Sequence, residues 1–568
     1  MSVELPPKFT TLPKKDGYPS CIDEWYACEI TEPKEDDKDQ VATANIIPPT
    51  KPIELSPELM LKIFFELYDN VEPTESVVEV MRLLTSVCHY WREVALSSTA
   101  FWSRIVVCNP LKGHVNMVRE WLRRSGSRPL TIDFTHYSCD EATQKRSTRI
   151  LKTLLKHVHR WYNVKFELSN FEAEHLGWPS SEDEAPLLRH FALIHEEDLS
   201  SDFSTTLWTS VCSTGLETIQ AYGCKLNRHM YRLDEDQFGE VGYLLGDDIE
   251  IMDRLQELQV EAYTTARFLY FVRSCAMLQR LVLHHIEDVD GPIFSILPNP
   301  RPLQPFPLSH LVELKIEGTS EAMEKIARYL VCPALRYFTF AGEGLDVEVV
   351  LRFLEDSNCQ LHSFDIEFDA PTPGALGALM DAFGSNLSQV ELMVLRMTIL
   401  DEPFIRPANR GVRVMPRLVA LACLVSGNEV DTAGELKSVV LDHIRSPRLR
   451  DLDLGTIGVC HRPLTRLVQR SGCRLQKLTI PLPLLRPATI LKLATLPELR
   501  DIVHLQVTVS DAGPLLSTMQ LNSIFPQLTR FMLLYDTADA DDLAQLFASR
   551  HETMEFTRIH RIPWIEFH

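Results

Sequence analysis

Two pairs of histidines have the residue type and spacing that metal binding would require. His284 and His285 are adjacent, and one residue separates His157 from His159. Imidazole nitrogens bind zinc, but neither pair has cysteines or carboxylates at the spacing of a zinc site. We therefore interpret them as exposed or helix-side histidines and expect no metal.

Asp451 and Asp453 are the carboxylate pair with the best spacing for acid–base chemistry. Residues two apart on a strand point to the same face, so both carboxylates could in principle act on one group. They alternate with Leu452 and Leu454, which favours solvated charges on a half-buried strand. The sequence has no glycine-rich phosphate-binding loop and no Gly-x-Ser-x-Gly motif. We predict a protein that is not an enzyme and uses no cofactor.

The composition narrows the class of protein. The chain has 568 residues, 45% of them hydrophobic, and a net charge of −21, which disfavours binding to nucleic acid or to an anionic membrane. Its 13 cysteines are odd in number and contain no Cys-x-x-Cys, as in reduced intracellular proteins. The first residues contain no apolar run that would indicate a signal peptide. We expect a cytoplasmic or nuclear protein, or one found in both compartments.

The stretch from Leu55 to Trp102 predicts a small helical unit. Ser56 precedes Pro57 and Glu58, a combination that caps a helix and places a proline and an acid in its first turn. Leu59 begins an apolar face that recurs every four residues. A unit of about fifty residues buries little surface by itself, so we expect it to gain further burial from a partner.

The order of residues in this stretch resembles an F-box. The resemblance is carried by a leucine and proline, an Ile-Phe pair, a leucine-rich second helix, and a closing set of tryptophans. Arg92 and Ala95 also match; Pro57 lies one place later than usual, and an insert near residues 68–76 lengthens the first link. The expected F-box and Skp1-binding residues are Leu55, Pro57, Glu58, Leu59, Ile63, Phe64, Leu67, Leu83, Leu84, Val87, Trp91 and Trp102.

The resemblance implies a helix-to-helix contact with the adaptor Skp1 and, through it, with a cullin. Within the set above, Trp91 and Trp102 are expected mainly to pack the box itself. The expected contact residues are Leu55, Pro57, Leu59, Ile63, Leu84 and Val87. The alternative is an ordinary helical hairpin that caps a repeat array.

A Leu-x-x-Leu-x-Leu unit, with apolar substitutes, repeats through the rest of the chain. In Leu449-Arg-Asp-Leu452-Asp-Leu454 the last two leucines point to one face of a strand, and the first lies in the preceding turn. One unit cannot bury that face, but stacked units can. Leu387 fits more loosely, with Val390 and Leu392. The predicted first residues are Leu188, Leu216, Leu255, Leu278, Leu311, Leu335, Leu361, Leu387, Leu418, Leu449, Leu475, Leu499 and Leu528.

These patterns predict an α/β fold. A small all-helical F-box unit would be followed by a curved solenoid that resembles leucine-rich repeats, with parallel strands inside and helices outside. The predicted segments are a disordered, acidic, proline-rich tail (1–50), the F-box-like unit (51–105), linking helices and first irregular repeats (106–185), and the solenoid (186–568). The alternative is an unrelated α/β domain.

The two parts together resemble the expanded F-box family of mushroom-forming fungi. That resemblance implies the substrate receptor of a Skp1–cullin–F-box ubiquitin ligase, which holds an unknown target protein on the concave face of its repeats. The alternative is a repeat scaffold outside any ligase. The expected target-binding residues, which lie before and between the buried strand positions, are Glu257, Gln259, Arg280, Glu313, Lys315, Tyr337, Asp365, Asp451, Asp453, Lys477 and Arg530.

Overall fold

The structure is a computed structural model of the chain, and it divides into two compact units, 1–215 and 216–568. The predicted tail, the insert after the first helix and much of the C-terminal segment lie outside the described residues. The described residues are 55–69, 77–137, 140–168, 185–194, 215–225, 254–263, 266–287, 304–342, 344–369, 373–399, 411–426, 430–455, 457, 461–481, 493, 495–511, 515, 525–537 and 555–561.

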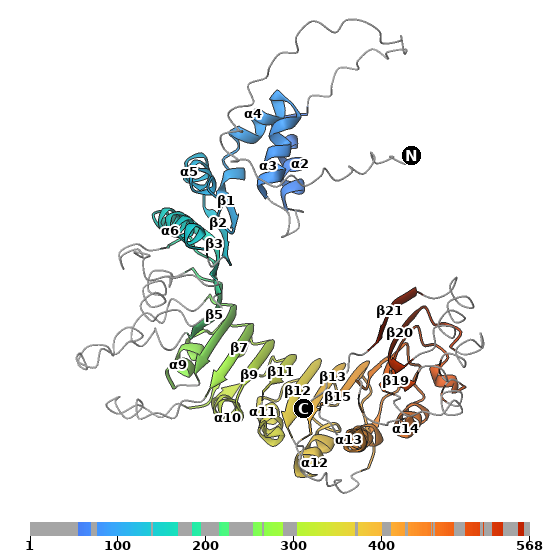
Figure 1. Cartoon of the computed structure of the whole chain (residues 1–568). Helices are drawn as coiled ribbons and strands as arrows, with labels where there is room; N and C mark the ends of the chain where they lie inside the picture. The colour runs from blue at the N-terminus through green and yellow to red at the C-terminus, as the bar shows by residue number, and fades with distance from the viewer. Residues whose placement is uncertain are drawn as a thin grey trace, which may run out of the picture. The chain divides into compact units, whose positions relative to one another are not determined.

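The first unit begins with a cluster of short helices (Figure 1). Ser56 precedes the first of them and its hydroxyl accepts a hydrogen bond from the Leu59 N–H at 3.5 Å, which confirms the predicted cap. Cys88 has the same role in the third helix, where its Sγ accepts from the Trp91 N–H at 3.5 Å. The elements are α2 (Pro57–Asp69), α3 (Val77–Val87), α4 (His89–Ser97) and the 3₁₀ turn η1 (Phe101–Ser103).

Parallel strands follow in the same unit, with two helices beside them (Figure 1). Val118, Trp121 and Leu122 are buried on one face of the first of these helices. Along β2 the burial alternates residue by residue, as expected for a strand with one covered face. The elements are β1 (Arg104–Cys108), α5 (His114–Arg124), β2 (Leu130–His136), α6 (Glu141–Leu155), η2 (Val158–Arg160), β3 (Trp161–Leu168) and β4 (His190–Ile194).

The second unit is built on a parallel sheet in which each strand pairs with the next one along the chain. The buried leucines of the repeat meet one another across the strands, so Leu314 is beside Phe338 and Leu421 is beside Leu452. The strands are β5 (Thr218–Lys225), β6 (Glu257–Tyr263), β7 (Arg280–Glu287), β9 (Glu313–Gly318), β11 (Tyr337–Ala341), β12 (Ser363–Asp369), β13 (Leu392–Thr398), β15 (Ala420–Ser426), β17 (Asp451–Asp453), β18 (Lys477–Pro481), β19 (His504–Asp511), β20 (Arg530–Thr537) and β21 (Glu555–Arg561).

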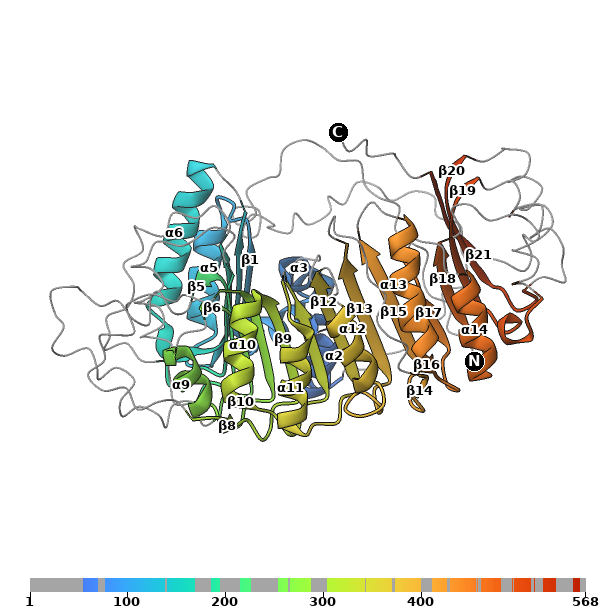
Figure 2. The ribbon, with the colours of Figure 1, turned by 90° about the horizontal axis from the view of Figure 1, so that it is seen from below.

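Helices cover one face of this sheet, and Figure 2 shows them in a row beside the strands. Short parallel pairs, β8 with β10 and β14 with β16, accompany them. These elements are β8 (Phe306–Pro307), β10 (Leu330–Val331), β14 (Arg413–Val414), β16 (Ile444–Arg445), η7 (Pro497–Leu499), α9 (Ala266–Ser274), α10 (Ser320–Tyr329), α11 (Val347–Ser357), α12 (Pro373–Ala382), α13 (Val430–His443) and α14 (His461–Ser471). The predicted parallel sheet with outer helices is thus confirmed at the level of fold class.

At two places the predicted repeat unit is three residues out of register. Met393 pairs with Phe364, so the unit there begins at Val390 and not at Leu387. Leu505 pairs with Leu478, so the later unit begins at Ile502, while Leu499 lies in η7. Both mistaken leucines are buried in the turn before the strand, so the apolar spacing of three residues simply continues upstream.

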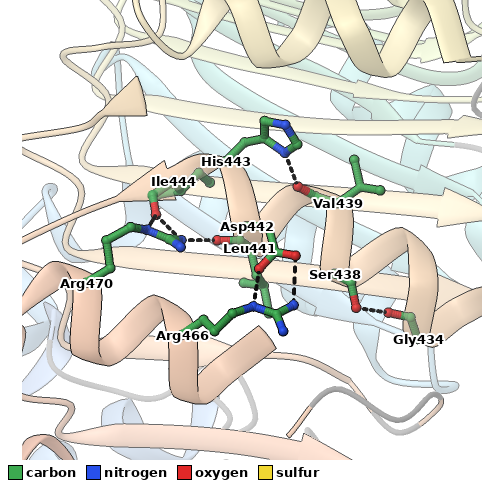
Figure 3. A network of polar contacts seen from close by, with 9 residues as sticks. All are labelled: Gly434, Ser438, Val439, Leu441, Asp442, His443, Ile444, Arg466 and Arg470. Carbon is green, nitrogen blue, oxygen red and sulfur yellow. Dashed lines mark hydrogen bonds and ion pairs between the residues drawn. The ribbon is translucent and has the colours of Figure 1, made fainter. Parts of the chain in front are cut away.

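Arginines of α14 join neighbouring repeats on the helical side (Figure 3). Arg470 donates to the carbonyls of Leu441 and Ile444, each at 2.6 Å, and so satisfies the end of α13. Arg466 makes a two-pronged contact with Asp442 at 2.9 and 2.8 Å. These bonds fix the spacing between successive helices. None of the described helices is both long and apolar enough to cross a membrane.

Candidate functional site

Aromatic rings form the core of the helical cluster. The Phe64 side chain is fully buried, and its ring centroid lies 5.0 Å from that of Trp91 and 6.0 Å from that of Phe101. Trp102 is also buried, with its indole N–H directed at the Leu96 carbonyl at 3.4 Å. The Arg124 guanidinium lies 4.6 Å from the centre of the Trp102 ring. The cluster is therefore packed from within by aromatic side chains.

The sides of α2 and α3 that do not enter this aromatic core leave five large aliphatic side chains exposed. We call this set the helical stripe: Leu59, Ile63, Leu67, Leu83 and Val87, with 49%, 42%, 49%, 62% and 52% of their surface exposed. Residues four apart on a helix lie on one side, so three of them line α2 and two line α3. A stripe of aliphatic side chains on so small a unit is typical of a surface that a partner covers.

The other predicted F-box residues have mixed environments. Leu84 is buried, so it belongs to the core and the exposed position beside it is Leu83. Pro57 and Glu58 are exposed, and Trp91 is half-buried. The half-buried Leu55 accepts a hydrogen bond at its carbonyl from the Tyr90 hydroxyl, at 2.7 Å.

Several core residues of the cluster were absent from the predicted set, among them Met60, Met81, Val94 and Phe101. Met60 lies four residues before Phe64, so a second apolar row along α2 was the signal that could have found it.

On the sheet, the predicted target-binding residues fall into two rows across the strands. We call the face of the sheet opposite α9–α14 the inner face. Strand register places Glu257 beside Arg280, then Glu313, then Tyr337, and further along it places Asp451 beside Lys477. The first row contains Glu257, Arg280, Glu313, Tyr337, Asp451, Lys477 and Arg530, and the second contains Gln259, Lys315, Asp365 and Asp453. Their placement follows the strand geometry, whereas their binding role stays a prediction.

Charges at the β6–β9 end of the inner face compensate one another. Arg280 lies between two glutamates, 2.5 Å from the Glu257 carboxylate and 3.0 Å from that of Glu313. Burial would lower the pKa of Arg280, but the two carboxylates raise it above its usual value. An incoming charged group would have to break these pairs, so this end is poorly suited to bind one.

His284 lies at the same β6–β9 end of the inner face, where charged side chains pair with one another. Its Nδ1 lies 2.7 Å from the Glu317 carboxylate and its Nε2 lies 2.9 Å from the Gln259 amide nitrogen. Burial opposes ionisation of Glu317, yet bonds from Lys315 and His284 lower its pKa. His285, with a φ of 46°, is exposed, so the two adjacent histidines have different environments.

The middle of the inner face is less compensated. Asp365 is held by Arg396 through bonds of 2.6 and 3.0 Å, and burial raises its pKa although Arg396 and Lys315 act in the opposite direction. Asp453 accepts a bond from the Gly455 N–H at 2.8 Å. Among the described residues, no hydrogen bond or ion pair engages the carboxylate of Asp451.

Neither histidine pair forms part of a cation site within the described ranges. The rings of His157 and His159 lie 6.2 Å apart. In that part of the chain no three His, Cys, Asp or Glu side chains gather as metal ligands would.

No family model matches the sequence, and no curated protein matches it.

Proposed function

We propose that this protein is the substrate-recognition subunit of a Skp1–cullin–F-box ubiquitin ligase. The helical cluster docks on Skp1, and the inner face of the repeat sheet holds the target protein. The chain itself performs no chemistry; it raises the effective concentration of the target near a bound conjugating enzyme. The protein would act in the cytoplasm, the nucleus or both.

The observation that carries the proposal is the helical stripe. Covering the exposed part of each aliphatic side chain contributes on the order of 1 kcal/mol, so five such residues supply a substantial part of a protein–protein affinity. The buried aromatic core holds these residues in place without using them. This division between an internal core and an unused aliphatic side is what a helix-to-helix docking module requires.

The sheet supports the second half of the proposal. The described helices α9–α14 lie on the other face of the sheet (Figure 2), and the inner face carries side chains of both charges together with an exposed tyrosine. Tyrosine is enriched at the centres of protein interfaces. A surface of this length and variety suits a protein partner better than a nucleic acid, whose phosphates would meet its carboxylates.

The first prediction concerns Skp1 binding. Leu59→Ser combined with Ile63→Ser removes two exposed aliphatic side chains from the stripe, so the fold should be unaffected while binding to purified Skp1 weakens by roughly 10-fold or more. Val412→Ser with Val414→Ser is the matched control, because these residues are 45% and 51% exposed but lie in the second unit. The measurement is calorimetric titration of the full chain with Skp1.

Equal affinity of the stripe variant and the wild-type chain would refute the proposal. A wild-type chain that does not bind Skp1 at all would also refute it and would favour the repeat scaffold. Co-purification of a cullin with the wild-type chain and Skp1 distinguishes a complete ligase from an isolated adaptor contact.

A further inference from the structure

The inner face between β11 and β17 differs from the rest of the sheet in its side chains. Its first row runs from Tyr337 through Ser363, Leu392 and Ala420 to Asp451. Tyr337 and Leu392 are 45% and 43% exposed, and they are the large apolar residues that the described inner face leaves open to solvent. The residues of this row that lie between Tyr337, Leu392 and Asp451 are Ser363 and Ala420, which have short side chains.

Short side chains lie on β15. The first two inner positions of β15 are Ala420 and Ala422, with Leu424 and Ser426 further along the strand, and the neighbours of the two alanines on β17 are Asp451 and Asp453. Alanine ends at Cβ, so a partner can approach the sheet closely there and reach both the aliphatic Leu392 and the carboxylates. Adjacent strands lie about 4.8 Å apart, so Leu392 and Asp451, two strands apart, are separated by about 10 Å.

The charges of this stretch are predominantly negative. Asp365 is neutralised by Arg396, and Asp453 is partly engaged by a backbone N–H. Glu367, which pairs in register with Arg396, and Asp451 have no hydrogen-bond or ion-pair partner among the described residues. At the β6–β9 end, in contrast, Arg280 and Lys315 each contact glutamates. Two acids that make no described ion pair therefore lie within a few strands of the exposed apolar side chains, and Lys477 is the register neighbour of one of them, Asp451.

We propose that this part of the inner face binds a target segment in which an aromatic or aliphatic side chain is flanked by lysine or arginine. The apolar side chain packs against Tyr337 and Leu392, and the basic groups meet Glu367 and Asp451. The chain's net charge of −21 adds long-range attraction for such a basic partner. This inference rests on the proposed function, because it assigns the chemistry of the target that the repeats would hold.

The test uses a defined fluorescein-labelled peptide, Gly-Lys-Phe-Arg-Leu-Lys-Gly, titrated into the purified full chain by fluorescence polarisation. Two control peptides replace the basic residues with glutamate, or the two apolar residues with serine. The basic–apolar peptide should bind at least about 10-fold more tightly than either control, and its affinity should fall as salt is raised. Stronger binding of the glutamate peptide, or no binding of any peptide, would overturn the proposal.

Variants locate the site. Glu367→Lys with Asp451→Lys reverses two acids that form no ion pair or hydrogen bond with another described side chain, so the chain should fold and the affinity should fall by about 10-fold or more. Tyr337→Ala should weaken binding without changing its salt dependence. The matched control is Glu355→Lys with Asp356→Lys, two exposed acids on α11 that make the same change in net charge on the opposite side.

The outcomes separate this proposal from the proposed function. Equal losses in the inner-face and α11 variants would show that net charge alone attracts the peptide, and would overturn the site. Skp1 affinity is measured on the same variants. If the inner-face variant binds the peptide as tightly as the wild-type chain and still binds Skp1, only the proposed site is refuted. If the wild-type chain does not bind Skp1 but the inner-face variant loses its affinity for the peptide, only the ligase function is refuted.

Discussion

A single buried arginine shows how one residue can complete an element that lies elsewhere in the chain. Arg160, in η2, is 6% exposed and its guanidinium donates to the Leu122 carbonyl at 3.5 Å and the Ser125 hydroxyl at 2.6 Å. A third bond goes to the Arg128 carbonyl at 3.0 Å. The end of α5 is thus satisfied from the following repeat, as a helix terminus in the interior must be. Burial lowers the pKa of Arg160.

Replacing Arg160 with methionine should lower the free energy of unfolding of the first unit by about 3 kcal/mol, because buried acceptors lose a charged donor. Tryptophan fluorescence during urea unfolding is the measurement, since seven of the eight tryptophans precede residue 216. Arg123→Met is the control: Arg123 is 70% exposed and pairs with Glu120 at the surface, so its loss should cost at most about 1 kcal/mol. Equal effects of the two changes would contradict this role for Arg160.

At the scale of elements, α2 has two apolar rows with different fates. Leu59, Ile63 and Leu67 remain exposed, while Met60 and Phe64 enter the core. Adjacent residues of α2 therefore have different roles: Ile63 is exposed and available to a partner, whereas Phe64 packs in the core of the cluster.

Phe64→Ala should therefore destabilise the helical cluster by roughly 3–5 kcal/mol, enough to unfold so small a group of helices. If the proposed function holds, Skp1 binding should be lost together with the helical circular-dichroism signal of the cluster, whereas the Leu59 and Ile63 variants should lose binding alone. A Phe64→Ala chain with a wild-type melting profile would contradict the core assignment. Trp91→Ala should have a smaller effect, because Trp91 is only half-buried.

At the scale of the whole molecule, stability accumulates between neighbouring repeats. Phe338 is fully buried, its ring centroid is 6.1 Å from that of Phe364 in the next strand, and it is 6.0 Å from that of Phe353 on the covering helix. In a stack of this kind each repeat depends mainly on its neighbours.

Phe338→Ala should accelerate amide hydrogen exchange in β9, β11 and β12 first, with a cost of about 3–5 kcal/mol, and leave exchange in β2 and α5 unchanged. Mass spectrometry of exchanged peptides measures this. A uniform change through both units would show that the chain unfolds as one cooperative body, contrary to the expectation for stacked repeats.

The sequence alone determined the kind of architecture. Apolar residues spaced as Leu449, Leu452 and Leu454 can be buried only when strands stack, and the helical period between them places helices on the covered face. Capping by Ser56 also follows from local chemistry, since it depends on residues within one turn. The inner-face rows could be predicted for the same reason: alternation along a strand is local.

Tertiary structure decided the features that depend on which neighbour a residue meets. Leu387 and Leu499 continue the three-residue apolar spacing upstream of their strands, so spacing alone does not show where the units begin. The pairing of Met393 with Phe364 and of Leu505 with Leu478 places those beginnings at Val390 and Ile502. Likewise, periodicity predicted the apolar row of α2 that begins at Leu59, and only packing shows that Phe64, in a second row, meets Trp91 and Phe101. The ion pairs of Arg280 with Glu257 and Glu313 also arise between segments that are distant in the sequence. Spacing along a chain fixes the direction of a side chain, and only packing fixes its partner.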